Sequence, residues 1–171
     1  ILGTAVHEIL RVGAPENTIP EERLFATIHD TVISGQIDLI THTPDGYIIS
    51  DYKTVRGAAL QFNPEGKIEW EKQLNCYAAL ARLNSREIQM FYFEKYGLIT
   101  ETKTVAGLEV VAIIRDWTAA QAKRNPDYPQ ASIVRIPIKM WPASVAAEYI
   151  SDRISTHYSD ENNGIRDHCS D

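Results

Sequence analysis

The sequence predicts an α/β (α+β) fold, in which a central mixed sheet of about four to five strands is flanked by helices. Three observations predict it. Strand-like segments separated by short turns occupy residues 24–53. Apolar residues at helical spacing stand on both sides of these segments, and further short apolar segments follow. A sheet covered by helices buries all of these apolar residues together.

The first part of the chain reads as one helix followed by three strands. Residues 1–12 carry apolar side chains at helical spacing, which predicts a helix. Leu24–Asp30 and Thr31–Ile40 are rich in strand-forming residues and read as two successive strands. Pro44-Asp45-Gly46 is a turn signal, and Tyr47–Lys53 after it reads as a third strand. The short turns predict an antiparallel meander.

The later elements follow from the same periodicity and punctuation. A loop is expected over Thr54–Gly66, because it contains glycines and a proline, and a helix over Ile68–Leu83. A strand over Ile88–Lys95 completes the core order αβββαβ. The remaining expected elements are an edge strand at Leu98–Val105, a long helix at Leu108–Arg124, a short strand at Ile133–Lys139 and a last helix at Pro142–Tyr158.

Length and composition are those of a globular domain. The chain has 171 residues, 44% hydrophobic and 23% charged, which is enough for a substantial core. We expect a single domain over residues 1–171, with its core in 1–96, an extension over 97–158 and a loose tail over 159–171. Ile1-Leu2-Gly3 reads like the middle of a helix, which is typical of an excised fragment.

Charge and cysteine content exclude several classes of function. A net charge of −6 and a pI near 5.4 argue against a protein that coats nucleic acid through a broad basic face. No apolar run approaches the ~20 residues of a transmembrane helix and no signal peptide opens the chain, so we expect a cytoplasmic protein with no membrane partner. Cys76 and Cys169 lack metal-ligand spacing, so neither zinc nor an iron–sulfur cluster is expected.

Asp38, Asp51 and Lys53 form the most informative pattern in the chain. Residues 51 and 53 point to one face of a strand, and an adjacent strand could bring Asp38 beside Asp51. Two carboxylates and one ammonium on one face are costly as a purely structural device, because the like charges repel. A bound divalent cation removes that objection. A structural salt bridge between Asp38 and Lys53 is the alternative interpretation.

Four further residues bear on this pattern. His7 lies on the first predicted helix, where a histidine is more often partly buried than a ligand. Gln73 and Tyr77 are four positions apart on the central predicted helix, so they share a face. Taken alone they could be an ordinary polar–aromatic pair. Gly35 lies three residues before Asp38, where a missing side chain could allow close backbone approach.

Together these residues resemble the PD-(D/E)XK nuclease superfamily, in particular its RecB-like exonuclease branch. The resemblance covers residues 1–96 and includes the order of the elements, which is that of a restriction-endonuclease-like core. Each matching segment is weak alone, but four in the family's order are specific. The segments are Gly3-Thr4-Ala5-Val6-His7, Gly35-Gln36-Ile37-Asp38, Asp51-Tyr52-Lys53-Thr54 and Gln73-Leu74-Asn75-Cys76-Tyr77.

The resemblance implies a metal centre for Mg²⁺ or Mn²⁺. Asp38 and Asp51 would be its carboxylate ligands, and the backbone carbonyl of Tyr52 would complete the inner shell. His7 would be a further ligand or would hold one in place. Some RecB-like nucleases also bind an iron–sulfur cluster through four cysteines. This chain has no early cysteine and only Cys169 near its end, so such a cluster is not expected.

The resemblance also implies how the remaining residues act. Lys53 would orient or deprotonate the attacking water and offset charge on the phosphate. Gln73 and Tyr77 would hold that lysine, or a substrate phosphate, from the helix. The reaction would be hydrolysis of a phosphodiester by metal-activated water. Asp38, Asp51, Lys53, Gln73 and Tyr77 are therefore the predicted catalytic residues.

The leading functional hypothesis is a metal-dependent DNA nuclease of bacterial or phage origin, expected to act as an exonuclease. Recombination, repair, phage replication or CRISPR spacer processing would be its setting, with a helicase or recombination protein as a possible partner. The alternatives are a non-catalytic module that binds DNA or protein and a sequence-specific endonuclease of the same fold. The oligomeric state is open. Trp70, Trp117 and Trp141 could stack on bases, although each is more typical of a packing residue.

Overall fold

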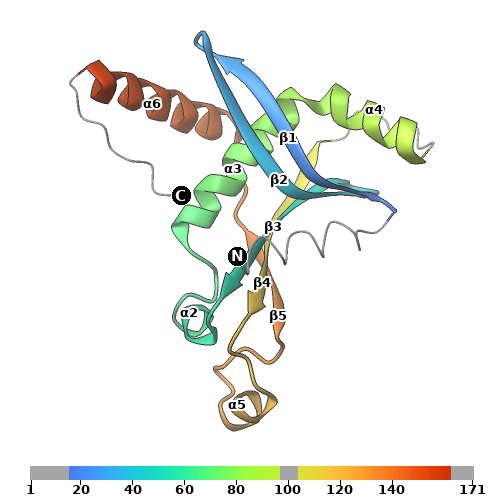
Figure 1. The fold of residues 1–171 in the computed structure, drawn as a ribbon, viewed down its shortest axis with the longest axis vertical. Coiled ribbons are helices and arrows are strands. Elements are labelled where there is room, and N and C mark those ends of the chain that lie inside the picture. Colours follow the sequence, from blue (N-terminus) through green and yellow to red (C-terminus); the bar gives the residue numbers. More distant parts are fainter. Residues whose placement is uncertain (1–15, 97–103, 163–171) are drawn as a thin grey trace.

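The computed structural model of the chain describes residues 16–96 and 104–162 (Figure 1). Within these residues, five strands form one sheet in the order β1-β2-β3-β4-β5, with helices packed on one face and around its ends. The strands are β1 (Thr18–Ile28), β2 (Thr31–Thr43), β3 (Gly46–Val55), β4 (Val105–Ile114) and β5 (Ile133–Ile138). The helices are α2 (Gly57–Phe62), α3 (Ile68–Leu83), α4 (Ser85–Tyr96), α5 (Ala119–Arg124) and α6 (Ala143–Asn162).

The sheet is mixed, as predicted. Strands β1, β2 and β3 form the expected antiparallel meander, β4 pairs parallel with β3, and β5 pairs antiparallel with β4. The parallel step requires a long crossover connection, which α2, α3 and α4 supply. The sheet and its flanking helices confirm the predicted restriction-endonuclease-like α/β class.

Strands β1 and β2 project from the sheet as a two-stranded arm (Figure 1). A two-residue turn joins them, in which His29 and Asp30 both have positive φ, of 48° and 60°. Two left-handed residues in succession are the mark of the turn type that fits the twist of a hairpin. Pairing between the strands continues to Ile28 and Thr31 at the tip, with an interruption opposite Asp38, where Glu21 has a positive φ of 55°.

Helix α3 crosses one face of the sheet and holds the core together. Its buried residues include Leu74 and Ala78, which are each 0% exposed. Asn75, on the same helix, is also 0% exposed and has three hydrogen-bond partners. Its side-chain N–H groups donate to the carbonyls of Glu71 and Lys139, and its oxygen accepts from the N–H of Trp141. This fixes the connection between β5 and α6 against α3.

The strand predicted over Ile88–Lys95 is wrong, because this segment belongs to helix α4. Its aromatic content favours a strand, but burial follows the helical period. Ile88 and Tyr92, four residues apart, are 2% and 0% exposed, whereas Met90 and Phe93 are more than half exposed. Tyr92 stacks on Tyr47 of β3 with ring centroids 5.8 Å apart, which fixes α4 against the sheet.

The long helix predicted over Leu108–Arg124 is also wrong. Its first half lies in strand β4, and only Ala119–Arg124 is helical, as α5. Strand β4 lies between β3 and β5 and is buried on both faces, with Val110 at 0% and Val111 at 6% exposure. Such a strand has a nearly continuous apolar run, which periodicity alone does not separate from a buried helix.

Other boundaries differ less. Helix α3 matches its predicted range, and β5 and α6 confirm the last strand and helix, although α6 continues to Asn162. Strand β1 begins at Thr18, before its predicted start, and α2 lies inside the predicted loop over Thr54–Gly66. The predicted helix over residues 1–12, and the edge strand at Leu98–Val105 up to residue 103, lie outside the described residues. Within the described ranges, no helix combines the length and apolarity that a membrane crossing requires.

Candidate metal centre

The candidate site lies where strands β2 and β3 separate. Their pairing runs from Thr43 and Gly46 to Leu39 and Ser50, and ends there. On its other edge β2 stays paired with β1 from Thr41 to Thr31, and β3 stays paired with β4 from Tyr47 to Val55. Figure 1 shows the β1–β2 arm turning away from β3. The next residue on β2 is Asp38 and the next on β3 is Asp51, so both carboxylates stand at the opening of this fork.

The Asp38 side chain accepts a hydrogen bond from a backbone N–H of β3 that no longer has a backbone partner on β2. Its Oδ2 atom accepts from the backbone N–H of Tyr52 at 2.7 Å, and Asp38 is 8% exposed. In an extended strand the N–H and C=O of one residue point to the same side. The carbonyl of Tyr52 therefore faces the fork as well, on the side of β3 that β2 has left.

Asp51 and Lys53 point to one face of β3, as the strand period predicted. The Nζ atom of Lys53 lies 2.7 Å from Oδ2 of Asp51. Asp51 is 2% exposed, and the Lys53 side chain is 28% exposed, so the ammonium reaches the site from the solvent side. The ion pair of Lys53 is thus with Asp51 and not the pair with Asp38 that was the alternative interpretation.

Helix α3 brings Gln73 and Tyr77 to this region. The Nε2 atom of Gln73 donates to the Tyr77 hydroxyl at 2.9 Å, which confirms that the two share a face. Burial raises the pKa of Tyr77 above 10.0, the hydrogen bond from Gln73 lowers it, and the charges of Asp51 and Asp38 raise it again. The phenol therefore stays protonated at neutral pH and lies within electrostatic range of both carboxylates.

Gly35 allows α3 to approach β2 as closely as it does. A Cβ atom at this position would lie 2.9 Å from Cδ1 of Leu80 and 2.9 Å from Cε1 of Tyr77. Real Cβ atoms do not tolerate such distances, so any side chain here would push the Tyr77 ring away. The atoms nearest to this glycine belong to side chains and not to the backbone that we expected there, and the space it leaves is taken by the Tyr77 ring and Leu80.

The opposite face of β3 carries a second polar group that sequence reasoning missed. Ser50, 1% exposed, donates to Glu109 of β4 at 2.7 Å, and Arg135 of β5 pairs with the same carboxylate. The Tyr52 side chain alternates to this face. Burial raises the pKa of Tyr52, Arg135 lowers it, and Asp38 and Glu109 raise it. Ser50, Glu109 and Arg135 thus link three neighbouring strands on this face of the sheet.

The donor set at the fork is of a kind that suits a hard divalent cation. Oxygen ligands are available from Asp38, Asp51 and the Tyr52 carbonyl, and Mg²⁺ and Mn²⁺ favour carboxylate and carbonyl oxygen. Among the residues that the structure describes, no cluster of three or more His, Cys, Asp or Glu side chains could hold a metal. The predicted ligand His7 lies outside the described residues. Within the described residues, Asp38 and Asp51 thus supply the side-chain ligands of the proposed metal centre.

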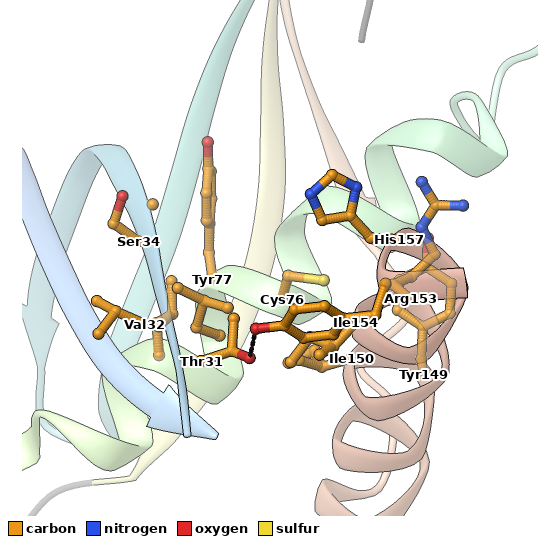
Figure 2. A pocket seen from close by; sticks show the side chains of 14 residues that line it. Thr31, Val32, Ser34, Cys76, Tyr77, Tyr149, Ile150, Arg153, Ile154 and His157 are labelled. Atoms are coloured by element: carbon orange, nitrogen blue, oxygen red, sulfur yellow. Dashed lines mark hydrogen bonds between the residues drawn. The ribbon is translucent and has the colours of Figure 1, made fainter. Parts of the chain in front are cut away.

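A groove adjoins the site and was not predicted. It lies between the β1–β2 arm, α3 and α6, has a volume of about 690 Å³, and includes Tyr77 in its wall (Figure 2). His157 and Arg153 of α6 line it as well. The sequence feature that could have indicated the groove is a helical repeat on the last helix. The side chains that share one of its faces and line the groove are those at positions 149, 150, 153, 154, 157 and 158.

The three tryptophans considered as stacking residues are engaged in packing. Trp70 is 8% exposed and belongs to the core. Trp117 donates from its indole N–H to the carbonyl of Pro129 at 2.8 Å. Trp141 donates from its indole N–H to the side-chain Oε1 of Glu71 at 2.5 Å and packs edge-on against Tyr149.

Comparisons with known proteins identify a family. The model of the PD-(D/E)XK nuclease superfamily matches residues 1–135, which extends past the segments that suggested the resemblance. No curated protein sequence matches the chain. Among solved structures, one titled "Crystal structure of SSO0001" is similar, with 16% sequence identity and a TM-score of 0.48. The similarity covers 91% of this chain and 57% of that chain, so this chain spans little more than half the length of that protein.

Proposed function

The chain belongs to the PD-(D/E)XK nuclease superfamily, and on that premise we propose that it is a divalent-metal-dependent deoxyribonuclease. We further propose that it is of the RecB-like type and acts as an exonuclease. The observation that supports this proposal is the fork between β2 and β3. Two carboxylates that are 8% and 2% exposed stand there with the ammonium of Lys53, which is an expensive arrangement without a cation.

Asp38, Asp51 and the carbonyl of Tyr52 would hold Mg²⁺ or Mn²⁺, with His7 as a further ligand. A divalent cation bound there lowers the pKa of a water molecule and neutralises charge on the phosphate oxygens. The protein's part is to fix these donors. Asp38 is held by the Tyr52 N–H and Asp51 by Lys53, so neither carboxylate rotates freely.

Lys53 is the residue best placed to act on the reacting groups. Its ammonium contacts Asp51, and its side chain is partly exposed to solvent. Lys53 can therefore contact both the metal ligand Asp51 and a substrate that approaches from solvent. There it orients the attacking water and offsets charge that develops on the phosphate. In the reaction a bond forms between phosphorus and the water oxygen, and the bond to the leaving oxygen of the next nucleotide breaks.

Gln73 and Tyr77 position groups at the edge of the site. The Tyr77 hydroxyl accepts from Gln73 and keeps its own proton, which it can donate to a phosphate oxygen. Because the pKa of Tyr77 is raised, the hydroxyl acts as a hydrogen-bond donor and not as a base at neutral pH.

The test is cleavage of matched linear and closed-circular DNA, and of an RNA of the same sequence, with Mg²⁺, Mn²⁺ or EDTA. Wild type is compared with Asp51→Ala and with Asp127→Ala, an exposed carboxylate beyond α5 that undergoes the same change in charge. We expect metal-dependent loss of linear DNA in wild type and Asp127→Ala, and none in Asp51→Ala.

The outcomes separate the alternatives. Cutting of the closed circle would show an endonuclease, and cutting of RNA alone would overturn the assignment to DNA. A folded wild-type protein that cleaves nothing with either metal would overturn the proposed activity. If it then retained DNA, and Asp51→Ala retained DNA equally, the non-catalytic binding module would replace the nuclease.

A further inference from the structure

The groove beside the metal centre differs in charge from the protein as a whole. The chain carries a net charge of −6. Of the described side chains that line the groove, none is acidic, and Arg153 and His157 are the ionisable basic ones. Figure 2 shows these two on α6, across from Ser34 of β2, with Cys76 of α3 between the walls. A groove of this kind attracts a polyanion that the rest of the surface repels.

Arg153 lines the groove on α6, and Cys76 lines it on α3. Burial raises the pKa of the Cys76 thiol, and the positive charge of Arg153 partly offsets that rise. The arginine is itself exposed and therefore accessible to a ligand. Hydroxyl and aromatic groups accompany it, since Tyr77 and Tyr149 also line the groove. Cations next to tyrosine rings are the usual composition of a site for an unpaired nucleic acid strand.

One end of the groove is closed by contact between the β1–β2 arm and α6. The tip of the β1–β2 arm touches α6 through two hydrogen bonds. Thr31 Oγ1 lies 2.8 Å from the Tyr158 hydroxyl, and His29 Nε2 lies 3.1 Å from Ser151 Oγ. Walls that meet at hydrogen-bond distance close the groove at this end to any strand, so a nucleic acid cannot run through between the arm tip and α6. The opposite side of the groove is bounded by Tyr77, which is within electrostatic range of Asp38 and Asp51.

We propose that this groove binds a single-stranded stretch of DNA and leads it to the metal centre. Arg153 and His157 contact the phosphates, and the tyrosine rings contact the bases. The proposal rests on the proposed function, because it takes the fork between β2 and β3 as the point of cleavage. Helix α6 begins at Ala143, beyond residue 135 where the family match ends, so this part of the site belongs to the chain's own extension.

The first test measures binding without cleavage. All variants carry Asp51→Asn, and affinity for a fluorescent oligothymidylate of roughly 12 nucleotides is measured by anisotropy with Mg²⁺. Arg153→Glu is compared with Arg86→Glu, which makes the same change in charge at an exposed arginine on α4. We expect Arg153→Glu to weaken binding about tenfold or more, because a charge-assisted contact is lost. Arg86→Glu should change it less than about twofold.

A second readout locates the strand. In a Cys169→Ser background, alkylation of the Cys76 thiol is followed at a fixed pH well above 9.0, because burial raises its pKa from that ordinary value. Bound oligothymidylate should slow alkylation at least about threefold, because Cys76 lines the groove. A hairpin duplex of equal length should slow it less. Equal protection by both, or protection by neither, would overturn the assignment of the groove to a single strand.

Failure of this inference can be told from failure of the proposed function. If wild type cleaves DNA but Arg153→Glu binds and cleaves single strands as Arg86→Glu does, the groove assignment is overturned and the nuclease remains. If wild type cleaves nothing but Arg153→Glu still loses affinity for the oligonucleotide and Cys76 is still protected, the groove stands and the nuclease falls.

Discussion

The backbone N–H of Tyr52 donates a 2.7 Å hydrogen bond to Oδ2 of Asp38, on the strand that has just stopped pairing with it. This bond has two consequences. It gives the N–H of Tyr52 an acceptor at a position where β2 no longer pairs with β3, and a buried N–H needs such a partner. It also holds one carboxylate of the proposed metal centre beside the backbone carbonyl that would be its neighbour in the coordination shell.

Lys53→Met should separate the structural cost of the buried carboxylate from its use in catalysis. Without the ammonium 2.7 Å from Asp51, the metal-free protein should lose about 1–3 kcal/mol of stability. The increase in melting temperature on adding Mg²⁺ should then be larger than in wild type, because the cation supplies the missing positive charge. Cleavage should fall at least about a hundredfold.

Asp51→Asn should have the opposite effect on the increase in melting temperature that Mg²⁺ causes. It removes a ligand, so the increase in melting temperature with Mg²⁺ should disappear while the metal-free protein stays folded. Measuring both variants by calorimetry, with EDTA and with Mg²⁺, checks the pair of expectations. An equal shift with Mg²⁺ in wild type and Asp51→Asn would show that the cation binds elsewhere.

Gly35→Ala should destabilise the protein by about 1–3 kcal/mol and reduce cleavage, because the new methyl group displaces Tyr77 and Leu80. Gly107→Ala is the matched control. A Cβ at Gly107 meets Cγ1 of Ile48 at 3.7 Å, an ordinary contact, so this change should be nearly neutral. Urea unfolding and initial cleavage rates measure the two effects. Similar costs for both variants would mean that Gly35 has no special role in placing α3.

Tyr92→Phe tests how α4 is attached to the sheet. The Tyr92 hydroxyl is buried and donates to the carbonyl of Ile40 at 2.9 Å, so its loss should cost about 1–2 kcal/mol. Tyr158→Phe makes the same chemical change at an exposed hydroxyl on α6 and should cost less than about 0.5 kcal/mol. Both costs are read from chemical unfolding, and a smaller cost at Tyr92 than at Tyr158 would contradict this account of the core.

Stability at alkaline pH should depend on Tyr77. Its pKa is raised in the folded protein, chiefly by burial, so the folded state holds the phenolic proton more tightly than the unfolded chain does. The contribution is therefore fully present below pH 10.0, the ordinary pKa, and is lost as pH rises through the higher folded value. The free energy of unfolding should fall less steeply between pH 9 and 11 in Tyr77→Phe than in wild type. An identical slope in both proteins would refute the raised pKa.

The two misassigned segments show where sequence patterns stop being informative. The aromatic side chains of Ile88–Lys95 favour a strand locally, but packing of Tyr92 on Tyr47 decided for a helix. The apolar run of β4 could be a buried helix or a buried strand. Its pairing with both β3 and β5, which lie far away in the sequence, decided for a strand. Local propensity is too weak to outweigh such contacts.

What the sequence determined by itself is the part of the site that depends on local periodicity. Asp51 and Lys53 share a face because a strand repeats every two residues, and Gln73 and Tyr77 share one because a helix turn spans about four. The tertiary structure alone decided that β2 leaves β3 at Asp38, and that α6 docks beside the arm to form a groove. Both depend on where pairing ends and on which faces pack, and these are contacts between residues far apart in the chain.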